Sequence, residues 1–168
     1  MALVLDGNGT MTVGNGDITG INTGALPSTF IGSGAMLQVV ATNDSVQRAV
    51  NSGTYTASGM LVTITPTSAT SKILVQFSSN IYKNTDGTGY ISIFRNGTNI
   101  AGSGNQLNLT SIFDKYVPCS ILFLDSPAST SALTYEVYYA RAGTNNIYIN
   151  STNSGATMGS ITVMEIAG

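Results

Sequence analysis

The residues that could act together as a general acid and a general base are five scattered carboxylates: Asp86, Asp114, Asp125, Glu136 and Glu165. Paired carboxylates cleave glycosidic bonds when one is protonated and the other is ionised. No pair here has a motif around it, and Asp86 beside Gly87 and Asp125 before Ser126 occupy positions typical of turns. Histidine is absent, which removes the Ser/His/Asp and Cys/His arrangements and most zinc sites. We therefore predict that the chain is not an enzyme.

Nucleophile, metal and nucleotide sites also lack support in the sequence. Cys119 is the single cysteine and lies in an apolar, strand-like run, which is typical of a buried structural thiol. The segment GNGDI at 14–18 is similar to one unit of a calcium-binding β-helix repeat, but one unit does not build a calcium site. No Walker sequence or dinucleotide fingerprint occurs. The sequence therefore predicts no cofactor and no metal.

Polar loops and tyrosines are the side chains that could bind a ligand. There are eight tyrosines and no tryptophan, and tyrosine can stack on a sugar ring and hydrogen-bond through its hydroxyl. The simpler interpretation is that these tyrosines are half-buried on pleated sheets. Three loops rich in Asn, Thr, Ser and Gly, at 83–89, 102–105 and 151–155, are stronger candidates because their polar groups are adaptable. The candidate ligand contacts are Asn84, Thr85, Asp86, Asn105, Thr152 and Asn153.

Composition limits the environment and the partners. Only 8% of the 168 residues are charged, against about 25% in a typical soluble domain. The net charge is −2 and the basic residues are scattered, which argues against nucleic-acid binding because that needs clustered Lys and Arg. The chain has no run of 18 apolar residues for a membrane span and no secretory signal at its start. We expect a protein without membrane insertion that leaves the cell by lysis, inside an assembled particle.

The first 34 residues differ from the rest and predict an arm. They contain GNG twice, at 7–9 and 14–16, with short apolar pieces at 3–5 and 11–13. Glycine at this density does not support a helix, and the apolar pieces are too short for a sheet of their own. Such a segment needs a partner, either identical copies of the chain or another protein. We therefore predict two parts: an attachment or oligomerisation arm at 1–34 and a folded domain at 35–168.

The folded domain is predicted to be all-β, an antiparallel β-sandwich of the jelly-roll type. Many short strands separated by turn residues, without a convincing helix, are typical of this class. Only 45–51 has helical promise, and it is too short to be stable alone. Asn96–Gly97 is the strongest hairpin signal, because a type I′ turn needs positive φ at both central residues. The predicted strands are 36–42, 53–56, 60–65, 71–83, 89–95, 98–101, 106–111, 117–125, 132–141, 145–150 and 158–166.

Two strands carry apolar residues on both faces. In 117–125, Ile121 and Phe123 share one face while Leu122 and Leu124 share the other. In 158–166, Met164 and Ile166 lie opposite Ile161 and Val163. A strand that is apolar on both faces is buried within a sandwich on one side and against a neighbour on the other. The pattern therefore predicts a homo-oligomer, and threefold symmetry suits a compact domain with an arm.

Four stretches carry a resemblance to a known family: MLQVV at 36–40, VTITPTSATSKILV at 62–75, FLDSP at 123–127 and the ending ITVMEI at 161–166. Together they resemble short virion proteins of tailed bacteriophages, especially phages of cyanobacteria and marine bacteria. The opening MALVLDGNGT resembles the amino-terminal arms of phage fibre-like proteins. These domains occur in tail fibres, head fibres and capsid decoration proteins, and they carry no catalytic residues.

The resemblance implies a virion structural protein with other tail or capsid proteins as partners. The leading hypothesis is a trimeric, fibre-like appendage that is attached by its arm and binds host-surface polysaccharide through its loops. The alternative is a capsid decoration or cement protein whose arm lies across coat subunits and stabilises the head. A glycan depolymerase is the third hypothesis.

Overall fold

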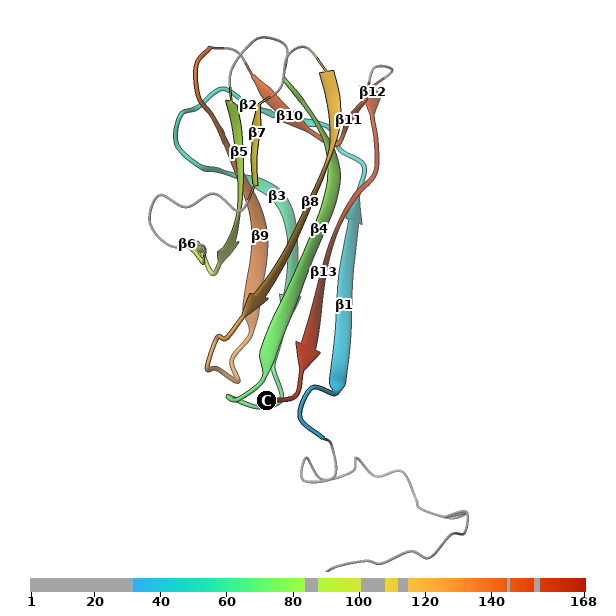
Figure 1. Ribbon diagram of the computed structural model, residues 1–168, viewed down its shortest axis with the longest axis vertical. Coiled ribbons are helices and arrows are strands. Elements are labelled where there is room, and N and C mark those ends of the chain that lie inside the picture. Colours follow the sequence, from blue (N-terminus) through green and yellow to red (C-terminus); the bar gives the residue numbers. More distant parts are fainter. Residues whose placement is uncertain (1–31, 84–87, 101–107, 112–114, 145, 153–154) are drawn as a thin grey trace, which may run out of the picture. The chain divides into compact units, whose positions relative to one another are not determined.

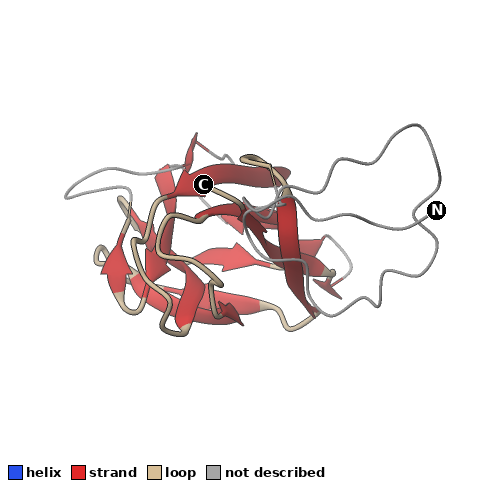
Figure 2. Ribbon diagram, turned by 90° about the horizontal axis from the view of Figure 1, so that it is seen from below, coloured by secondary structure: helices blue, strands red, loops and turns tan. Residues whose placement is uncertain are grey.

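The computed structural model describes residues 32–168 except for 84–87, 101–107, 112–114, 145 and 153–154. Every regular element in this part of the chain is a β-strand, as Figure 2 shows in a view along the long axis. The described part contains no helix long and apolar enough to cross a bilayer. Of the predicted arm, only Gly32–Gly34 is described, so the prediction for the arm lies outside these residues.

The strands form two antiparallel sheets (Figure 1). Sheet A contains, in spatial order, β1 (Met36–Asp44), β13 (Gly159–Ile166), β4 (Lys72–Lys83) and β8 (Lys115–Asp125). At the end of β4, sheet A is continued by β10 (Ile147–Ile149) and β2 (Arg48–Val50). Sheet B contains β3 (Thr56–Ile64), β9 (Leu133–Arg141), β5 (Thr88–Arg95), β6 (Thr98–Asn99) and β7 (Asn108–Ser111). A separate hairpin pairs β11 (Ser151–Thr152) with β12 (Gly155–Ala156).

The strand order identifies the sandwich as a jelly roll. The eight longest strands are, in chain order, β1, β3, β4, β5, β7, β8, β9 and β13. Sheet A holds the first, eighth, third and sixth of them, and sheet B holds the second, seventh, fourth and fifth. Two Greek keys wound together give this order. The predicted fold class is therefore confirmed.

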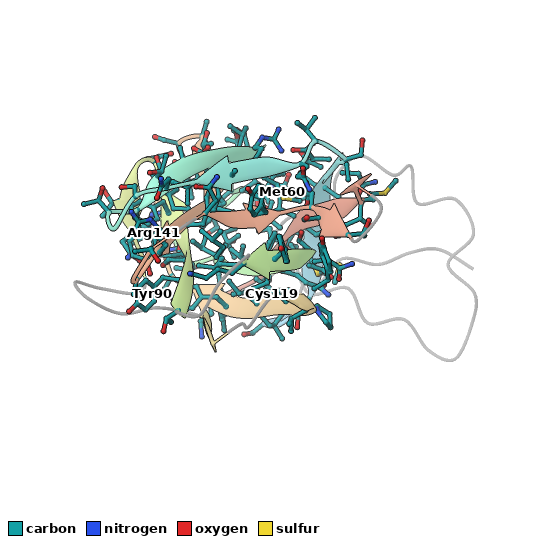
Figure 3. All side chains as sticks on the ribbon, turned by 90° about the horizontal axis from the view of Figure 1, so that it is seen from above. Met60, Tyr90, Cys119 and Arg141 are labelled. Atoms are coloured by element: carbon teal, nitrogen blue, oxygen red, sulfur yellow. The ribbon has the colours of Figure 1, made fainter. Side chains whose placement is uncertain are left out.

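The core fills the space between the two sheets, where the period-2 patterns place alternate apolar side chains. Val75 and Phe77 of sheet A and Tyr135 and Val137 of sheet B are fully buried. Figure 3 shows the side chains filling the domain, with Met60 from β3 and Cys119 from β8 in its interior. Cys119 is 3% exposed, and burial raises the pKa of its thiol to about 11. Its prediction as a buried structural thiol is confirmed.

The 45–51 segment, which was expected to be too short for a stable helix, contains β2 (Arg48–Val50), and β2 pairs with β10. One local prediction was wrong. The predicted strands 53–56 and 60–65 are replaced by the single strand β3, which begins at Thr56. A bulge interrupts its pairing with β9, and Gly59 in this bulge has a φ of 73°. Tertiary pairing thus decided both cases, since an isolated two-turn helix is unstable and a bulge leaves no clear sequence pattern.

The predicted type I′ hairpin is confirmed. Asn96 and Gly97 have φ values of 49° and 78°, and they join β5 to β6 through the pair Arg95 and Thr98. The Asn96 side chain also accepts a hydrogen bond from the backbone N–H of Thr134. The turn therefore sets the β5 register and ties it to β9.

Candidate functional site

Three tyrosines meet on the outer face of sheet A, at the end where β4 finishes. Tyr82 of β4 pairs across the strands with Tyr116 of β8 on one side and with Tyr148 of β10 on the other. The Tyr82 and Tyr116 rings are stacked with centroids 4.4 Å apart, and the Tyr82 and Tyr148 centroids are 5.6 Å apart. We call these three residues the tyrosine row.

Strand alternation points the tyrosine row outward. Ile81 and Lys83, the neighbours of Tyr82, are fully buried between the sheets, so Tyr82 faces the opposite way. Tyr116 lies on β8, which pairs only with β4 among the described strands, and it is 37% exposed. The tyrosine row therefore presents aromatic surface and hydroxyl groups at the edge of the sheet.

The described outward neighbours of the tyrosine row on β4, β8 and β10 are polar. The Asn146 side chain donates to the Tyr148 hydroxyl at 3.3 Å. The next outward pair along the strands is Asn80 with Pro118, followed by Ser78 with Ser120. Aromatic rings with hydroxyl and amide neighbours bind sugars, because the rings cover apolar C–H faces while the polar groups take hydrogen bonds.

The opposite end of the same face is apolar. One row crosses all four main strands of sheet A: Val39, Met164, Leu74 and Leu124. Leu122 is 69% exposed beside it, and Met36 and Ile166 extend it toward the start of β1. We call these seven residues the apolar stripe. Leu74 and Tyr82 are eight positions apart on β4, which corresponds to about 26 Å.

These exposures bear out the prediction of two-faced strands. Ile121, Ile161 and Val163 are buried in the core, while Leu122 and Leu124 are exposed on the outer face. The outer face of sheet A is therefore divided into an apolar end, near the start of β1, and an aromatic end.

Most of the predicted ligand contacts are not described by the structure. Asn84, Thr85, Asp86, Asn105 and Asn153 lie outside the described residues. Thr152 lies in β11, where its hydroxyl donates to the Gly155 carbonyl at 3.0 Å. Figure 1 places β11 and β12 at the same end of the domain as β10 and the start of β8. Thr152 is therefore found at the end that carries the tyrosine row.

Asn150 holds this end together from inside. It is fully buried with a φ of 53°. Its side-chain oxygen accepts from the Ser79 hydroxyl at 2.7 Å, and its side-chain nitrogen donates to the carbonyls of Asp44 and Val46. A Cβ on Gly159 would come within 2.2 Å of the Asn150 oxygen, so only glycine fits there. Asn150 thus joins the end of β1, β4 and the β11–β12 hairpin.

The described carboxylates have structural environments. The prediction that Asp125 occupies an ordinary turn was wrong, because it ends β8 with a buried side chain. Its Oδ2 lies 2.6 Å from Arg95 Nη1 and accepts from the Tyr135 hydroxyl at 2.7 Å. This cluster ties sheet A to sheet B. Glu136 accepts from the Gly59 backbone N–H at 2.8 Å.

Glu165 is fully buried at the end of β13. Its carboxylate accepts from the Gln38 side chain at 2.6 Å and from the Thr67 backbone N–H and hydroxyl at 2.7 and 2.8 Å. Burial raises its pKa, but the bonds from Gln38 and Thr67 outweigh this, and the net pKa lies below its ordinary value. Glu165 and Asp125 both pair with Ile73 from opposite sides, so Ile73 stands between them.

Sequence reasoning missed the tyrosine row as a cluster. The tyrosines lie on three strands distant in the sequence, and only the register of β10, β4 and β8 brings them together. The one available signal is that Tyr82, Tyr116 and Tyr148 all lie in or beside predicted strands at their loop ends.

Comparisons with known proteins show weak structural likeness only. No family model matches the chain, and no curated protein matches it. Three similar solved structures are a mutant VP2 protein of infectious bursal disease virus, the VP2 subviral particle of that virus, and its Gx strain. Their identities are 12%, 13% and 14%, and their TM-scores are 0.37, 0.35 and 0.32. They cover 77%, 78% and 81% of this chain, which spans 36%, 33% and 37% of their length. The jelly-roll assignment rests on the strand order.

Proposed function

We propose that the chain is a structural protein of a tailed-bacteriophage virion, a trimeric fibre-like appendage that binds a host-surface polysaccharide. In this proposal the arm attaches it to the particle, and the tyrosine row with the neighbouring loops contacts the glycan. It is assembled in the host cytoplasm and released by lysis. It has no enzymatic step, cofactor, nucleic-acid partner or membrane-inserted segment.

The observation that carries the proposal is the division of one sheet face into two ends. The apolar stripe includes Met36 at the start of β1, the end of the domain to which the proposed arm is joined. The tyrosine row lies about 26 Å away along β4. An appendage needs this separation, because one end must hold other virion subunits while the other faces the host. The resemblance to phage fibre-like proteins supports the same arrangement.

Binding to the host polysaccharide tests the proposal. The full chain is incubated with polysaccharide extracted from the host envelope, and the affinity is measured by biolayer interferometry. We expect Tyr116→Ser to weaken binding about fivefold or more, since stacking of a ring-shaped group on an aromatic side chain contributes on the order of 1–3 kcal/mol. Tyr116→Phe keeps the ring and should retain most of the affinity. Leu61→Ser, at an exposed position of sheet B, is the matched control.

A capsid decoration protein remains the second candidate, because the apolar stripe could equally be covered by coat subunits. A decoration protein binds purified capsids and raises their melting temperature, whereas a fibre binds host envelope without the capsid. Binding to capsids together with no binding to envelope polysaccharide would favour decoration.

The depolymerase hypothesis has a separate test. Incubation of host polysaccharide with the protein should release no new reducing ends. New reducing ends released by the purified protein would contradict the non-enzymatic proposal.

A further inference from the structure

The apolar stripe is exposed in the isolated chain. Four of its members are at least half exposed: Met36 57%, Val39 53%, Leu122 69% and Leu124 50%. They stand with Leu74 and Met164 on consecutive strands in register. A contiguous apolar area of this kind on a domain with so little charge marks an interaction surface.

We propose that the apolar stripe binds the segment Leu3–Asp6 in the arm of a neighbouring copy of this chain. The inference rests on the oligomer in the proposed function and names its contact. The segment consists of Leu3, Val4 and Leu5 followed by Asp6, so it offers a short apolar run that ends in a negative charge.

Charge complementarity supports this occupant. Lys72 is exposed on the outer face of β4, opposite Ile166 and two residues before Leu74. It is the one charged side chain on the described part of that face, and no ion pair of Lys72 occurs among the described residues. The arm contains Asp6 and Asp17 and no Lys or Arg. An arm laid over the stripe therefore brings a carboxylate to a face whose only described charge is positive.

The position and length of the arm also fit. The described chain begins at Gly32, four residues before Met36, which belongs to the stripe. Asp6 precedes Gly32 by 26 residues, and an extended chain of that length reaches about 90 Å. The arm thus leaves one stripe and can reach the next. If each copy binds the stripe of the next copy in this head-to-tail way, the copies close into a ring, and a ring of three is a trimer.

Photo-cross-linking of the full chain identifies what covers the stripe. Leu122→p-benzoylphenylalanine places a photoreactive group at the most exposed stripe position, in an equal mixture of ¹⁴N- and ¹⁵N-labelled copies. Cleavage after methionine separates residues 2–11, with the apolar segment, from 61–158, with β4 and β8. We expect a cross-link to residues 2–11 of the other isotope, and none from the control Leu61→p-benzoylphenylalanine. A cross-link to another fragment, one confined to a single copy, or none would overturn the proposal.

Charge reversal tests the pairing of Asp6 with Lys72. Lys72→Glu and Asp6→Lys should each weaken self-association in sedimentation velocity, and the double variant should recover most of the loss. Additive losses would overturn the ion pair. Polysaccharide binding measured on the same variants keeps the two proposals apart, because the tyrosine row is distant from the stripe. Weaker self-association of these variants with unchanged polysaccharide binding would support the arm contact. Unchanged self-association would contradict the arm contact, and wild-type protein that does not bind polysaccharide would contradict the proposed function.

Discussion

Replacing Asn150 tests how the loop end of the domain is held. Asn150→Ala removes three side-chain hydrogen bonds, with Ser79, Asp44 and Val46. At about 0.5–1.5 kcal/mol each, their loss costs about 3 kcal/mol. The φ of 53° adds about 1 kcal/mol, because alanine adopts left-handed backbone less readily than asparagine. We therefore expect Asn150→Ala to lower the free energy of unfolding by about 4 kcal/mol.

Two further variants separate these contributions. Asn150→Gly loses the same hydrogen bonds but tolerates positive φ, so it should cost about 1 kcal/mol less than Asn150→Ala. Asn43→Ala, at an exposed position of β1, should change the stability by less than about 0.5 kcal/mol. Urea unfolding followed by tyrosine fluorescence at constant protein concentration measures all three. A cost below about 1 kcal/mol for Asn150→Ala would refute the network, and equal costs for the two variants would refute the backbone contribution.

Three titration and reactivity predictions follow from buried groups. Because the pKa of Glu165 is lowered in the folded chain, its carboxylate stabilises the fold above the ordinary pKa of 4.5, and this stability is lost as pH falls through the folded pKa. Glu165→Gln should therefore flatten the fall in Tm between pH 5 and pH 3. Parallel curves of Tm against pH for the two proteins would contradict this. Burial, and then the hydrogen bond to Asp125, raise the pKa of Tyr135. The protonated Tyr135 hydroxyl stabilises the fold below its ordinary pKa of 10.0, and this stability is lost as pH rises above that value. The Tyr135→Phe variant should therefore be less stable than the wild type at pH 7. It should also lose less stability than the wild type between pH 9 and pH 11. Cys119 should not react with a thiol reagent at pH 8 until urea unfolds the chain, because burial raises its pKa to about 11; rapid labelling of the native protein would show an accessible thiol.

The sequence predicts those parts of the fold that local patterns encode. The sequence alternation in β9 predicts which of its faces is buried. All four residues on that face are buried in the structure: Leu133, Tyr135, Val137 and Tyr139. Asn96–Gly97 predicts its own turn, because both residues tolerate the positive φ that the structure shows. These features depend on residues within one strand or one turn, where side-chain period and φ preference are decisive.

Features that depend on long-range pairing could not be predicted in this way. Asp125 stands before Ser126 like a turn residue, and only the approach of Arg95 and Tyr135 from sheet B explains its burial. The tyrosine row likewise needs the register of three strands. Arg48–Val50 becomes a strand because Ile147–Ile149 is available to pair with it, and that partner lies about a hundred positions later in the chain.

Immunogold electron microscopy of intact particles, with antibody raised against residues 32–168, tests the central claim most directly. The proposed appendage predicts gold at the tail or on projecting fibres, with the polysaccharide-binding end facing outward. Gold spread evenly over the head would contradict the fibre proposal and make capsid decoration the better account. Particles without any gold would contradict a virion role altogether.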